Sequence, residues 1–399
     1  MTKQRAPRTA AVLSAVLLAA VAGCTANGPA QARLAAPQSS TPAAAPGSAA
    51  ADGRGFTLVA SGDVLPHDSV IRQAAADADG EGHDFKPMFA AVKPLVSAAD
   101  LALCHMETVY GPEDGPFAGY PAFVSPPQIA EALKATGYDG CSTASNHTLD
   151  DGADGLRRTL DAFDRQGLGH AGSARTAAEA ARPQIYRAGT AKIAHLAYTY
   201  DTNGYPLPDG QPWAVNLMDE KKIVADSRAA RRAGADVVLV SLHWGTEWQT
   251  APDEVQLTLG KALTASRTAG RPDIDLILGT HAHIPQAYEK VNGSWVVYGM
   301  GDQIAGKMFN DEGHHDPRGN YGSIGRFRFE PPARAGERWR VTRAEFVPQW
   351  MDTDAGRLVN LPAALAEHPD RDDYRTAQDA ISEAVLGRGA ARDGLTMAR

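Results

Sequence analysis

The stretch "DLILGTHAHIPQAYE" (residues 275–289) passes from an apolar segment into Gly279 and then places His281 and His283 one residue apart. Consecutive apolar residues are typical of a strand that is buried on both faces, in a sheet covered by helices. Residues just past the carboxyl ends of such strands face the ligand crevice. The stretch therefore predicts an α/β sheet with two imidazoles at its functional edge.

Other short apolar segments repeat this pattern and alternate with helical ones. The five predicted core strands span residues 56–64, 99–107, 139–145, 236–244 and 274–281. The predicted helices, several of which end at a capping glycine, span residues 85–99, 125–137, 154–167, 218–234 and 253–266.

Two hairpins interrupt the alternation, at residues 184–200 and 286–302, and Asn292-Gly293 in the second is a strong type I′ turn signal. Mixed sheets flanked by helices indicate one layered α/β domain over residues 55–352. Residues 353–399 are expected to form a helical tail without an assigned role.

The first residues indicate export. Lys3, Arg5 and Arg8 precede an apolar run that ends before Cys24, which predicts a secretory signal peptide over residues 1–23. The run is shorter than the roughly 20 apolar residues that a membrane-spanning helix needs. "VAGC" resembles the lipobox of bacterial lipoproteins, which implies that Cys24 is lipidated and anchors the protein to the outer face of the cell membrane. In the alternative, the signal is cleaved nearby and Cys24 is incidental.

Residues 24–54 are rich in Ala, Pro, Ser and Gly. They are predicted to form a flexible tether, because they have too little apolar surface to bury to offset the conformational entropy lost on ordering. Two cysteines remain beyond the tether, Cys104 and Cys141, both near the ends of predicted strands. Export makes a disulfide chemically possible. The sequence does not show whether their side chains meet, and we expect two buried free thiols.

The charge balance restricts the partners. The formal net charge is −8, with 22% charged residues, so the chain has no general attraction to nucleic acid, and none is expected as a partner. An anionic substrate would need positive charge supplied locally. A metal ion can supply it.

Each predicted core strand carries a metal-ligand residue type at its carboxyl end. Singly, such residues are more often structural, but five successive strands with the same feature favour a metal site. Oxygen and nitrogen donors suit Zn²⁺, Mn²⁺ or Fe. The donors, in chain order, are Asp63, His105, Glu107, Asn146, His147, His243, His281 and His283.

The donor set suggests a pair of divalent ions. Two cations about 4 Å apart repel each other, so a carboxylate normally bridges them, and together they activate water. Glu107 is the expected bridge and Asp63 a terminal ligand, while His147 is left to protonate a leaving group. The remaining expected ligands are Asn146, His243, His281 and His283.

The order of "GD", "ADLxxxxxE", "SNHxxDxG", "HWGxE", "GTHxH" and "VVYGMGD" resembles the CapA-type poly-γ-glutamate biosynthesis proteins, in the calcineurin-like metallophosphoesterase superfamily, over residues 56–305. The resemblance implies a four-layer αββα sandwich and a two-metal site. It also implies a role in poly-γ-glutamate or capsule biogenesis. Motif by motif, the resemblance implies that the metal ligands are Asp63, Glu107, Asn146, His243, His281 and His283. It also places His147, together with Asn146, in the family's "NNH" segment.

Several positions depart from the family pattern. The Asp-x-His motif of typical phosphoesterases is absent, because Val64 and Leu65 follow Asp63, which leaves one metal position weak or empty. His105 replaces the usual Asn and is either an extra ligand or a packing residue. The other departures are Ser145 for Asn, Ala282 for Pro, and "GMGD" (residues 299–302) for "SLGN".

Trp244, the last residue of the fourth predicted strand, and Glu247, three residues further on, are expected at a substrate rim. In the alternative, Trp244 packs in a loop and Glu247 is solvated. Asp150, Asp151 and Asp154 are expected to favour the N-terminus of the helix that follows them, through its dipole.

Two functions remain open. The first is an exported, lipid-anchored, metal-dependent hydrolase or transferase that acts on a phosphoester or an envelope polymer. The second is a non-catalytic envelope protein that binds an anionic polymer, such as poly-γ-glutamate, or assists a synthase complex in export. An unrelated envelope role is a third reading.

Overall fold

The computed structural model describes residues 55–310, 312–334 and 336–398. Residues 275–280 contain strand β12 (Leu276–Thr280), which lies inside a six-stranded sheet. Leu276 and Leu278 point to one face of this sheet and Ile277 to the other, because side chains alternate along a strand. Both faces are buried, as the continuous apolar run predicts.

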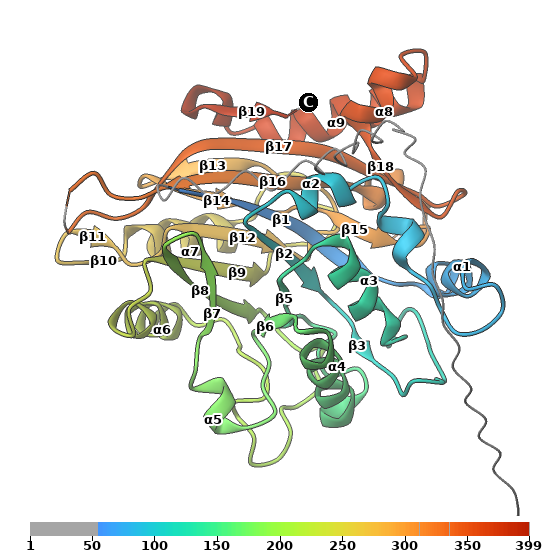
Figure 1. Cartoon of the computed structure of the whole chain (residues 1–399), viewed down its shortest axis with the longest axis horizontal. Helices are drawn as coiled ribbons and strands as arrows, with labels where there is room; N and C mark the ends of the chain where they lie inside the picture. Colours follow the sequence, from blue (N-terminus) through green and yellow to red (C-terminus); the bar gives the residue numbers. More distant parts are fainter. Residues whose placement is uncertain (1–54, 311, 335, 399) are drawn as a thin grey trace, which may run out of the picture. The chain divides into compact units, whose positions relative to one another are not determined.

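The fold is built on two large mixed sheets, in which all five predicted core strands are confirmed (Figure 1). The larger sheet has the order β18 (Arg357–Asn360), β17 (Arg340–Asp352), β16 (Tyr321–Glu330), β1 (Phe56–Leu65), β2 (Leu101–Met106), β5 (Gly140–Ser142) and β6 (Gly169–Ala171), with β15 (Asp302–Ala305) paired to β1 and β19 (Leu395–Met397) to β17. The smaller sheet has the order β13 (Tyr288–Val291), β14 (Ser294–Val297), β12, β9 (Val237–His243), β8 (Ala191–Thr199) and β7 (Gln184–Ala188). Two-stranded pairs are formed by β3 (Val109–Tyr110) with β4 (Val124–Ser125), and by β10 (Arg267–Thr268) with β11 (Arg271–Pro272).

Three apolar clusters define the layers. The first lies between the two sheets and includes Leu58 of β1 and Leu239 of β9. The second lies on the outer face of the larger sheet, under α3 (Gln128–Thr136) and α4 (Gly152–Gln166), and the third on the outer face of the smaller sheet, under α6 (Glu220–Arg232) and α7 (Glu254–Ala265). The four-layer αββα architecture is therefore confirmed.

All five predicted helical segments are present, although α4 begins two residues before its expected range, at Gly152. The prolines divide residues 85–99 into a 3₁₀ turn (Lys86–Phe89) and α2 (Lys93–Ser97). Helix α1 (Asp68–Asp77) was not predicted. The Asn292-Gly293 turn is confirmed, since both residues have positive φ, 52° and 92°. The remaining helices are α5 (Ala177–Ala180), α8 (Leu361–Glu367), α9 (Asp372–Leu386) and the 3₁₀ turns Pro317–Asn320 and Ala390–Asp393.

Residues 353–398 pack onto the larger sheet, and they contain the strands β18 and β19 besides the expected helices. β18 and β19 both pair with β17, and apolar residues of α9 join the cluster between the sheets; α8 and α9 lie over β17 at the top of Figure 1. Among the described residues, no helix combines the length and apolarity that crossing a membrane requires. The signal peptide, Cys24 and the tether lie outside the described residues.

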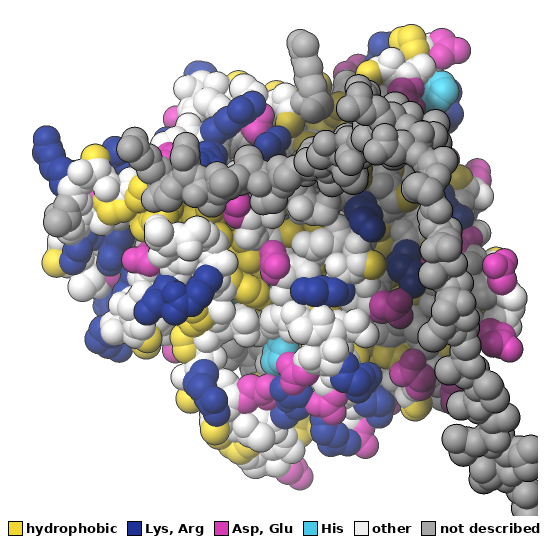
Figure 2. All heavy atoms as spheres, viewed as in Figure 1, with side chains coloured by type: hydrophobic (Ala, Val, Ile, Leu, Met, Phe, Trp, Pro, Cys, Tyr) yellow, Lys and Arg dark blue, Asp and Glu magenta, His cyan; other side chains and the backbone are white. Residues whose placement is uncertain are grey.

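Surface charge is mixed rather than concentrated on the face shown in Figure 2. Basic and acidic side chains are interspersed there. Where described side chains are visible in this view, an extended polyanion therefore meets no continuous basic track.

The expectation of two free thiols is wrong, because Cys104 and Cys141 form a disulfide. The two residues are direct partners in the parallel pair of β2 and β5, and their Cα atoms are 4.4 Å apart. Strand register decides whether two such side chains meet, and the sequence pattern did not fix it.

This disulfide leads to a prediction on thiol content and stability. Denaturing the oxidised, mature protein should expose no free thiol from these two positions, and replacing both by serine should lower the free energy of unfolding by about 2–4 kcal/mol, because the bridge restricts the unfolded chain. Thiol titration in denaturant and urea unfolding with and without reductant measure both effects. Two titratable thiols in the oxidised protein would contradict the prediction.

Gly279, near the end of β12, leaves room for a hydrogen bond between Trp244 and Tyr298. The indole Nε1–H of Trp244 donates to the carbonyl oxygen of Tyr298 at 2.9 Å. A Cβ at Gly279 would lie 2.0 Å from that carbonyl oxygen and 2.6 Å from the indole nitrogen. The glycine is required here by close approach.

We expect Gly279→Ala to lower the free energy of unfolding by about 1–3 kcal/mol or more, since backbone must move to accept the methyl group. Gly260→Ala is a matched control in α7, where the added Cβ would meet only ordinary contacts, the nearest at 3.5 Å. That change should be neutral or stabilising by about 0.5–1 kcal/mol. Equal unfolding curves for the two variants would contradict the claim that a methyl group at position 279 forces the backbone to move.

Candidate metal centre

Strand register places the donors side by side at one edge of the larger sheet. Asp63 of β1 is the direct partner of His105 in β2 and of Asp302 in β15. In the smaller sheet, His243 at the end of β9 is the partner of Thr280 at the end of β12. The two sheets thus bring their carboxyl ends to the same place.

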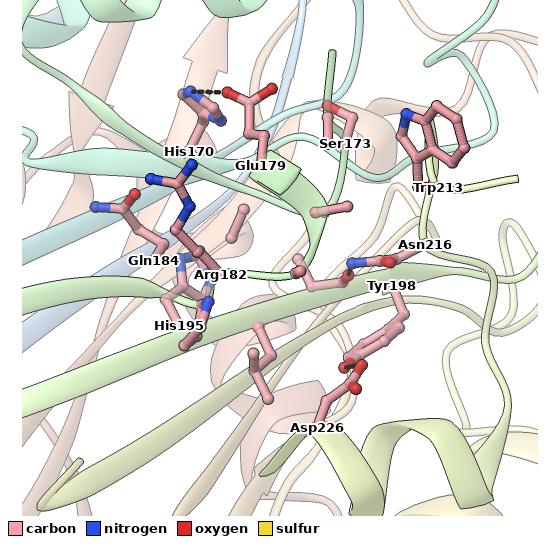
Figure 3. A pocket seen from close by; sticks show the side chains of 18 of the residues that line it. His170, Ser173, Glu179, Arg182, Gln184, His195, Tyr198, Trp213, Asn216 and Asp226 are labelled. Carbon is pink, nitrogen blue, oxygen red and sulfur yellow. Dashed lines mark hydrogen bonds and ion pairs between the residues drawn. The ribbon is translucent and has the colours of Figure 1, made fainter. Parts of the chain in front are cut away.

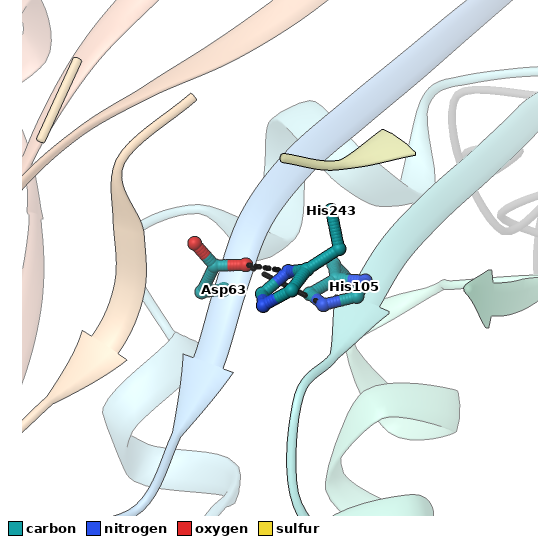
Figure 4. A group of neighbouring side chains, drawn as sticks. All are labelled: Asp63, His105 and His243. Atoms are coloured by element: carbon teal, nitrogen blue, oxygen red, sulfur yellow. Dashed lines mark ion pairs between the residues drawn. The ribbon is translucent and has the colours of Figure 1, made fainter. Parts of the chain in front are cut away.

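Three groups of side chains lie there, and within each group the donor atoms are all within 4.8 Å of one another. The Asp63 group, shown in Figure 4, consists of Asp63, His105 and His243. The Asp302 group consists of Asp63, Glu107, His283 and Asp302, and the Glu247 group of Glu247, His281 and His283. Because Asp63 and His283 each belong to two groups, the centre is continuous and offers adjacent positions for cations.

The other expected ligands join the same centre. His243 Nε2 is 3.7 Å from Glu107 Oε1 and 2.8 Å from Asn146 Oδ1. His105 Nε2 is 3.6 Å from Asp63 Oδ1, and its ring stacks on that of His243 with centroids 4.7 Å apart. All seven metal-ligand candidates are therefore brought together, including His105.

The abrupt placement of the two histidines after β12 is explained by the backbone. His281 and His283 both have positive φ, 90° and 58°, a conformation that is uncommon for residues other than glycine. The turn aims the backbone N–H of His281 at Asp63 Oδ2, 3.1 Å away. Local strain is thus used to bring both imidazoles back over the strand ends.

Neighbouring groups orient the imidazoles. His283 Nδ1–H donates to Asp302 Oδ1 at 2.9 Å. His105 Nδ1 forms a hydrogen bond with the hydroxyl of Ser142 at 2.7 Å, and His243 Nδ1 one with that of Thr280 at 3.1 Å. Such partners hold the ring so that the other nitrogen points at a metal.

The buried atoms left without partners are those that a cation would use. Asp63 Oδ1, both oxygens of Glu107, Asp302 Oδ2, His105 Nε2 and His281 Nδ1 have no hydrogen-bond partner in the described structure. Buried unpaired carboxylates are costly, and a divalent cation relieves that cost. The donor groups therefore fit a divalent metal ion.

Burial and mutual repulsion govern the carboxylates when no cation is bound. Burial, followed by repulsion from Asp302, raises the pKa of Asp63 to about 8. Burial also raises the pKa of Asp302 to about 6 and holds that of Glu107 well above its usual range. Each shift reports a negative charge that needs a positive partner.

Burial keeps most of the imidazoles neutral, which is the form that binds metal. It lowers the pKa of His105 to about 3 and holds those of His243 and His281 well below the ordinary value. For His283, burial opposes protonation, but the carboxylates of Asp302 and Glu107 outweigh it and hold the pKa well above the usual range.

His147 lies beside the donor groups with its ring held in place. Its Nδ1–H donates to Asp150 Oδ2 at 2.6 Å, and the ring packs edge-on against Phe123 with centroids 4.8 Å apart. Asp150 therefore does not act on the helix dipole as expected. Asp151 and Asp154 do lie at the start of α4, where they pair with Arg158 and Arg157.

The expected substrate rim is half wrong. Trp244 is fully buried under the smaller sheet and cannot reach a substrate. Glu247 lies at the edge of the centre, with Oε1 3.9 Å from His281 Nε2. The exposed wall is formed instead by Tyr200, whose ring centroid is 4.5 Å from that of His281.

Sequence reasoning missed three residues. Asp302 was seen only as a departure from the family pattern, although a carboxylate in place of an amide was a usable signal. Asn203 accepts a hydrogen bond from Asn146 Nδ2 at 3.2 Å, and Tyr200 flanks the imidazoles. The last two stand in an irregular connection after β8, which carries no strand-end pattern.

Comparison with known proteins agrees with this placement. Residues 57–307 match the family described as bacterial capsule synthesis protein PGA_cap. The chain is 29% identical over 179 residues to the PGA biosynthesis protein CapA of Bacillus subtilis, covering 44% of this chain and 45% of that protein. It is 27% identical over 226 residues to a probable polyglutamine synthesis accessory protein of Mycobacterium tuberculosis, covering 52% and 56%. The chain spans about half the length of the curated relatives it matches.

Among solved structures, similar folds include the calcineurin-like phosphoesterase YfkN of Bacillus subtilis, with 14% identity, coverage of 82% and 99%, and a TM-score of 0.43. A phosphatase of Mycoplasma pneumoniae has 14% identity, coverage of 74% and 93%, and a TM-score of 0.43. The family match extends over more than half of the sequence and contains the whole centre from Asp63 to Asp302. The chain belongs to the bacterial capsule synthesis protein PGA_cap family.

Proposed function

We propose that this protein is a metal-dependent hydrolase or transferase of cell-envelope polymer biogenesis, with poly-γ-glutamate or capsule as the process. The observation that carries the proposal is the set of buried donor groups that share Asp63 and His283 and leave their oxygens unpaired. The names of the relatives, which refer to PGA, capsule and polyglutamine synthesis, support the process.

We propose two divalent ions at this centre, of the Mn, Zn or Fe type. Oxygen and imidazole donors without thiolates suit these metals. Asp63, His105 and His243 would hold one ion, and Glu107, His283 and Asp302 the other, with Asn146, His281 and Glu247 at the edge. When bound, such ions lower the pKa of water and stabilise charge on phosphoryl oxygens.

The chain's own residues supply proton transfer and exclusion of water. Asp150 fixes the Nδ1 proton of His147, which leaves Nε2 to exchange a proton with a leaving group. His147 is only 6% exposed, and Phe123 packs against its ring. Tyr200 covers His281 from the solvent side.

We further propose that the signal peptide and a lipid on Cys24 place the protein at the outer face of the cell membrane, where it would act on an anionic or envelope polymer beside a synthase complex. Export fits the disulfide, which forms in oxidising compartments.

The test combines elemental analysis with an activity assay. Purified protein should contain Mn, Zn or Fe and hydrolyse bis(p-nitrophenyl) phosphate, and chelation should remove both the metal and the activity. Protein without bound metal, after reconstitution with each of the three ions, would overturn the proposal.

The second candidate is a non-catalytic protein that binds an anionic polymer or assists a synthase, and the accessory role in the name of the mycobacterial relative favours it. It predicts that poly-γ-glutamate binding survives His147→Ala but weakens in Asp63→Asn. Metal-loaded protein that binds this polymer and turns over no phosphodiester would select this candidate.

A further inference from the structure

A pocket of about 630 Å³ lies apart from the metal centre, and its lining contains none of the residues assigned there. Figure 3 shows it between the segments around β6 and α5 on one side and β8 and α6 on the other. It is thus formed where the edges of the two sheets diverge.

Strand lengths explain why the space is open. β7 begins at Gln184, opposite His195 of β8, so residues 196–198 of β8 have no strand neighbour on that side. Residues 214–217 close one end, because Val215 bridges to Ser173 and Leu217 to Thr199. The pocket is therefore built by the main chain.

The acidic groups that line the pocket are already neutralised. Arg175 forms ion pairs with Glu179 and with Asp164, the latter at 2.7 Å. Asp226 accepts hydrogen bonds from Tyr198 at 2.8 Å and from Lys222 at 2.6 Å. None of these carboxylates needs a cationic ligand.

The unused polar groups are mainly donors. The buried Nε1–H of Trp213 and Nδ1 of His195 have no hydrogen-bond partner in the described structure. Arg182 bonds the carbonyl oxygen of Ala178 through Nε, and it forms no ion pair with any described residue. In Figure 3, Trp213 stands on one side of the pocket, and Arg182 with the carboxamide of Gln184 on the other. A ligand that satisfies this lining must bring acceptors and negative charge.

We propose that this pocket binds an acidic ligand, with Arg182 holding a carboxylate group and the Trp213 indole N–H, on the other side of the pocket, donating to a second acceptor of the same ligand. The planar carboxylate matches the fork of a single guanidinium. Its source is either a small free acid or the end of an acidic, amide-linked chain. Binding does not depend on the metal centre.

Calorimetry on the full chain tests the proposal with three probes: glutarate, the neutral isostere glutaramide, and a trimer of γ-linked glutamate. We expect glutarate to bind at least about tenfold more tightly than glutaramide, because one charge-assisted hydrogen bond is worth that much. Tighter binding of the trimer than of glutarate identifies a chain end, and equal binding a free acid.

Variants locate the site. Arg182→Gln and Trp213→Phe should each weaken glutarate binding about tenfold. Arg187→Gln removes an exposed arginine on β7, outside the pocket lining, and should have no effect. Asp63→Asn should also leave binding intact, which separates this site from carboxylate binding at a metal.

A spectroscopic readout covers the case in which Trp213→Phe perturbs folding. The indole N–H proton resonance of Trp213, one of six tryptophans, should move downfield on adding glutarate to the unsubstituted protein. No calorimetric binding of either carboxylate probe, or unchanged binding in Arg182→Gln with a stationary Trp213 resonance, would overturn the proposal.

Discussion

Replacing Asp63 by asparagine is expected to leave the purified protein without bound metal. Asp63 belongs to two of the three donor groups, and its Oδ1 is buried without a partner. An amide keeps the size of the side chain and an acceptor for the N–H of His281, but it removes the charge. We expect metal affinity to fall by at least about a hundredfold, measured by elemental analysis after dialysis against trace metal.

The same change should stabilise the metal-free protein, which distinguishes loss of a ligand from loss of the fold. Without a cation, burial raises the pKa of Asp63 to about 8, against about 3.9 in an unfolded chain. The stability that this protonated group contributes is fully present below about pH 4 and is lost as pH rises through about 8. After chelation, Asp63→Asn should therefore exceed the unsubstituted protein in free energy of unfolding by roughly 1–3 kcal/mol at pH 8, and by less at pH 5.

The exposed Asp209 provides a matched control, because Asp209→Asn changes the same charge away from the site. It should change neither metal content nor the pH dependence of unfolding. If Asp63→Asn keeps its metal, or is less stable than the unsubstituted protein after chelation at pH 8, the proposed role of Asp63 is wrong.

The sequence could predict most of the centre because its residues stand at strand ends. Parallel strands bring their carboxyl ends to one edge, so Asp63, His105, His243 and His281 follow from locating the strands. The alternation of side chains along β9 also indicated that Trp244 is buried. Val238, Val240 and Leu242 face the outer helices, and Trp244 continues that even-numbered series into the core.

The sequence could not supply the register between neighbouring strands, or the way in which the chain turns after a strand and brings a side chain back to the centre. The Cys104–Cys141 bridge requires β2 and β5 to pair without an offset, and neither strand's pattern specifies this. Asp302 reaches Asp63 because β15 adds in parallel beside β1, whereas the segment reads locally as the end of a hairpin. Asp150 illustrates the same limit, since a local rule for helix starts competed with a contact to His147 that depends on how residues 146–150 turn.

Removing the imidazole of His147 is expected to abolish turnover while the metal stays bound. His147 is not a member of any of the three donor groups, and its ring is held by Asp150 and Phe123. General acid catalysis by a positioned side chain contributes about a hundredfold to ten-thousandfold in rate. His147→Ala should therefore lose about that much in kcat for bis(p-nitrophenyl) phosphate, with the metal content of the unsubstituted protein.

Asp150→Asn tests how His147 is prepared for this task. Asp150 Oδ2 accepts both from His147 Nδ1–H and from the backbone N–H of Phe123, the latter at 2.7 Å. An asparagine whose oxygen takes the place of Oδ2 still accepts from both N–H groups, so it keeps the ring in place, but it removes the negative charge that stabilises the protonated imidazole. We expect kcat to fall with metal content and melting temperature nearly unchanged, whereas Asp154→Asn in the first turn of α4 should retain full activity. If Asp150→Asn turns over as fast as the unsubstituted protein, the negative charge of this carboxylate has no part in preparing His147 for proton transfer.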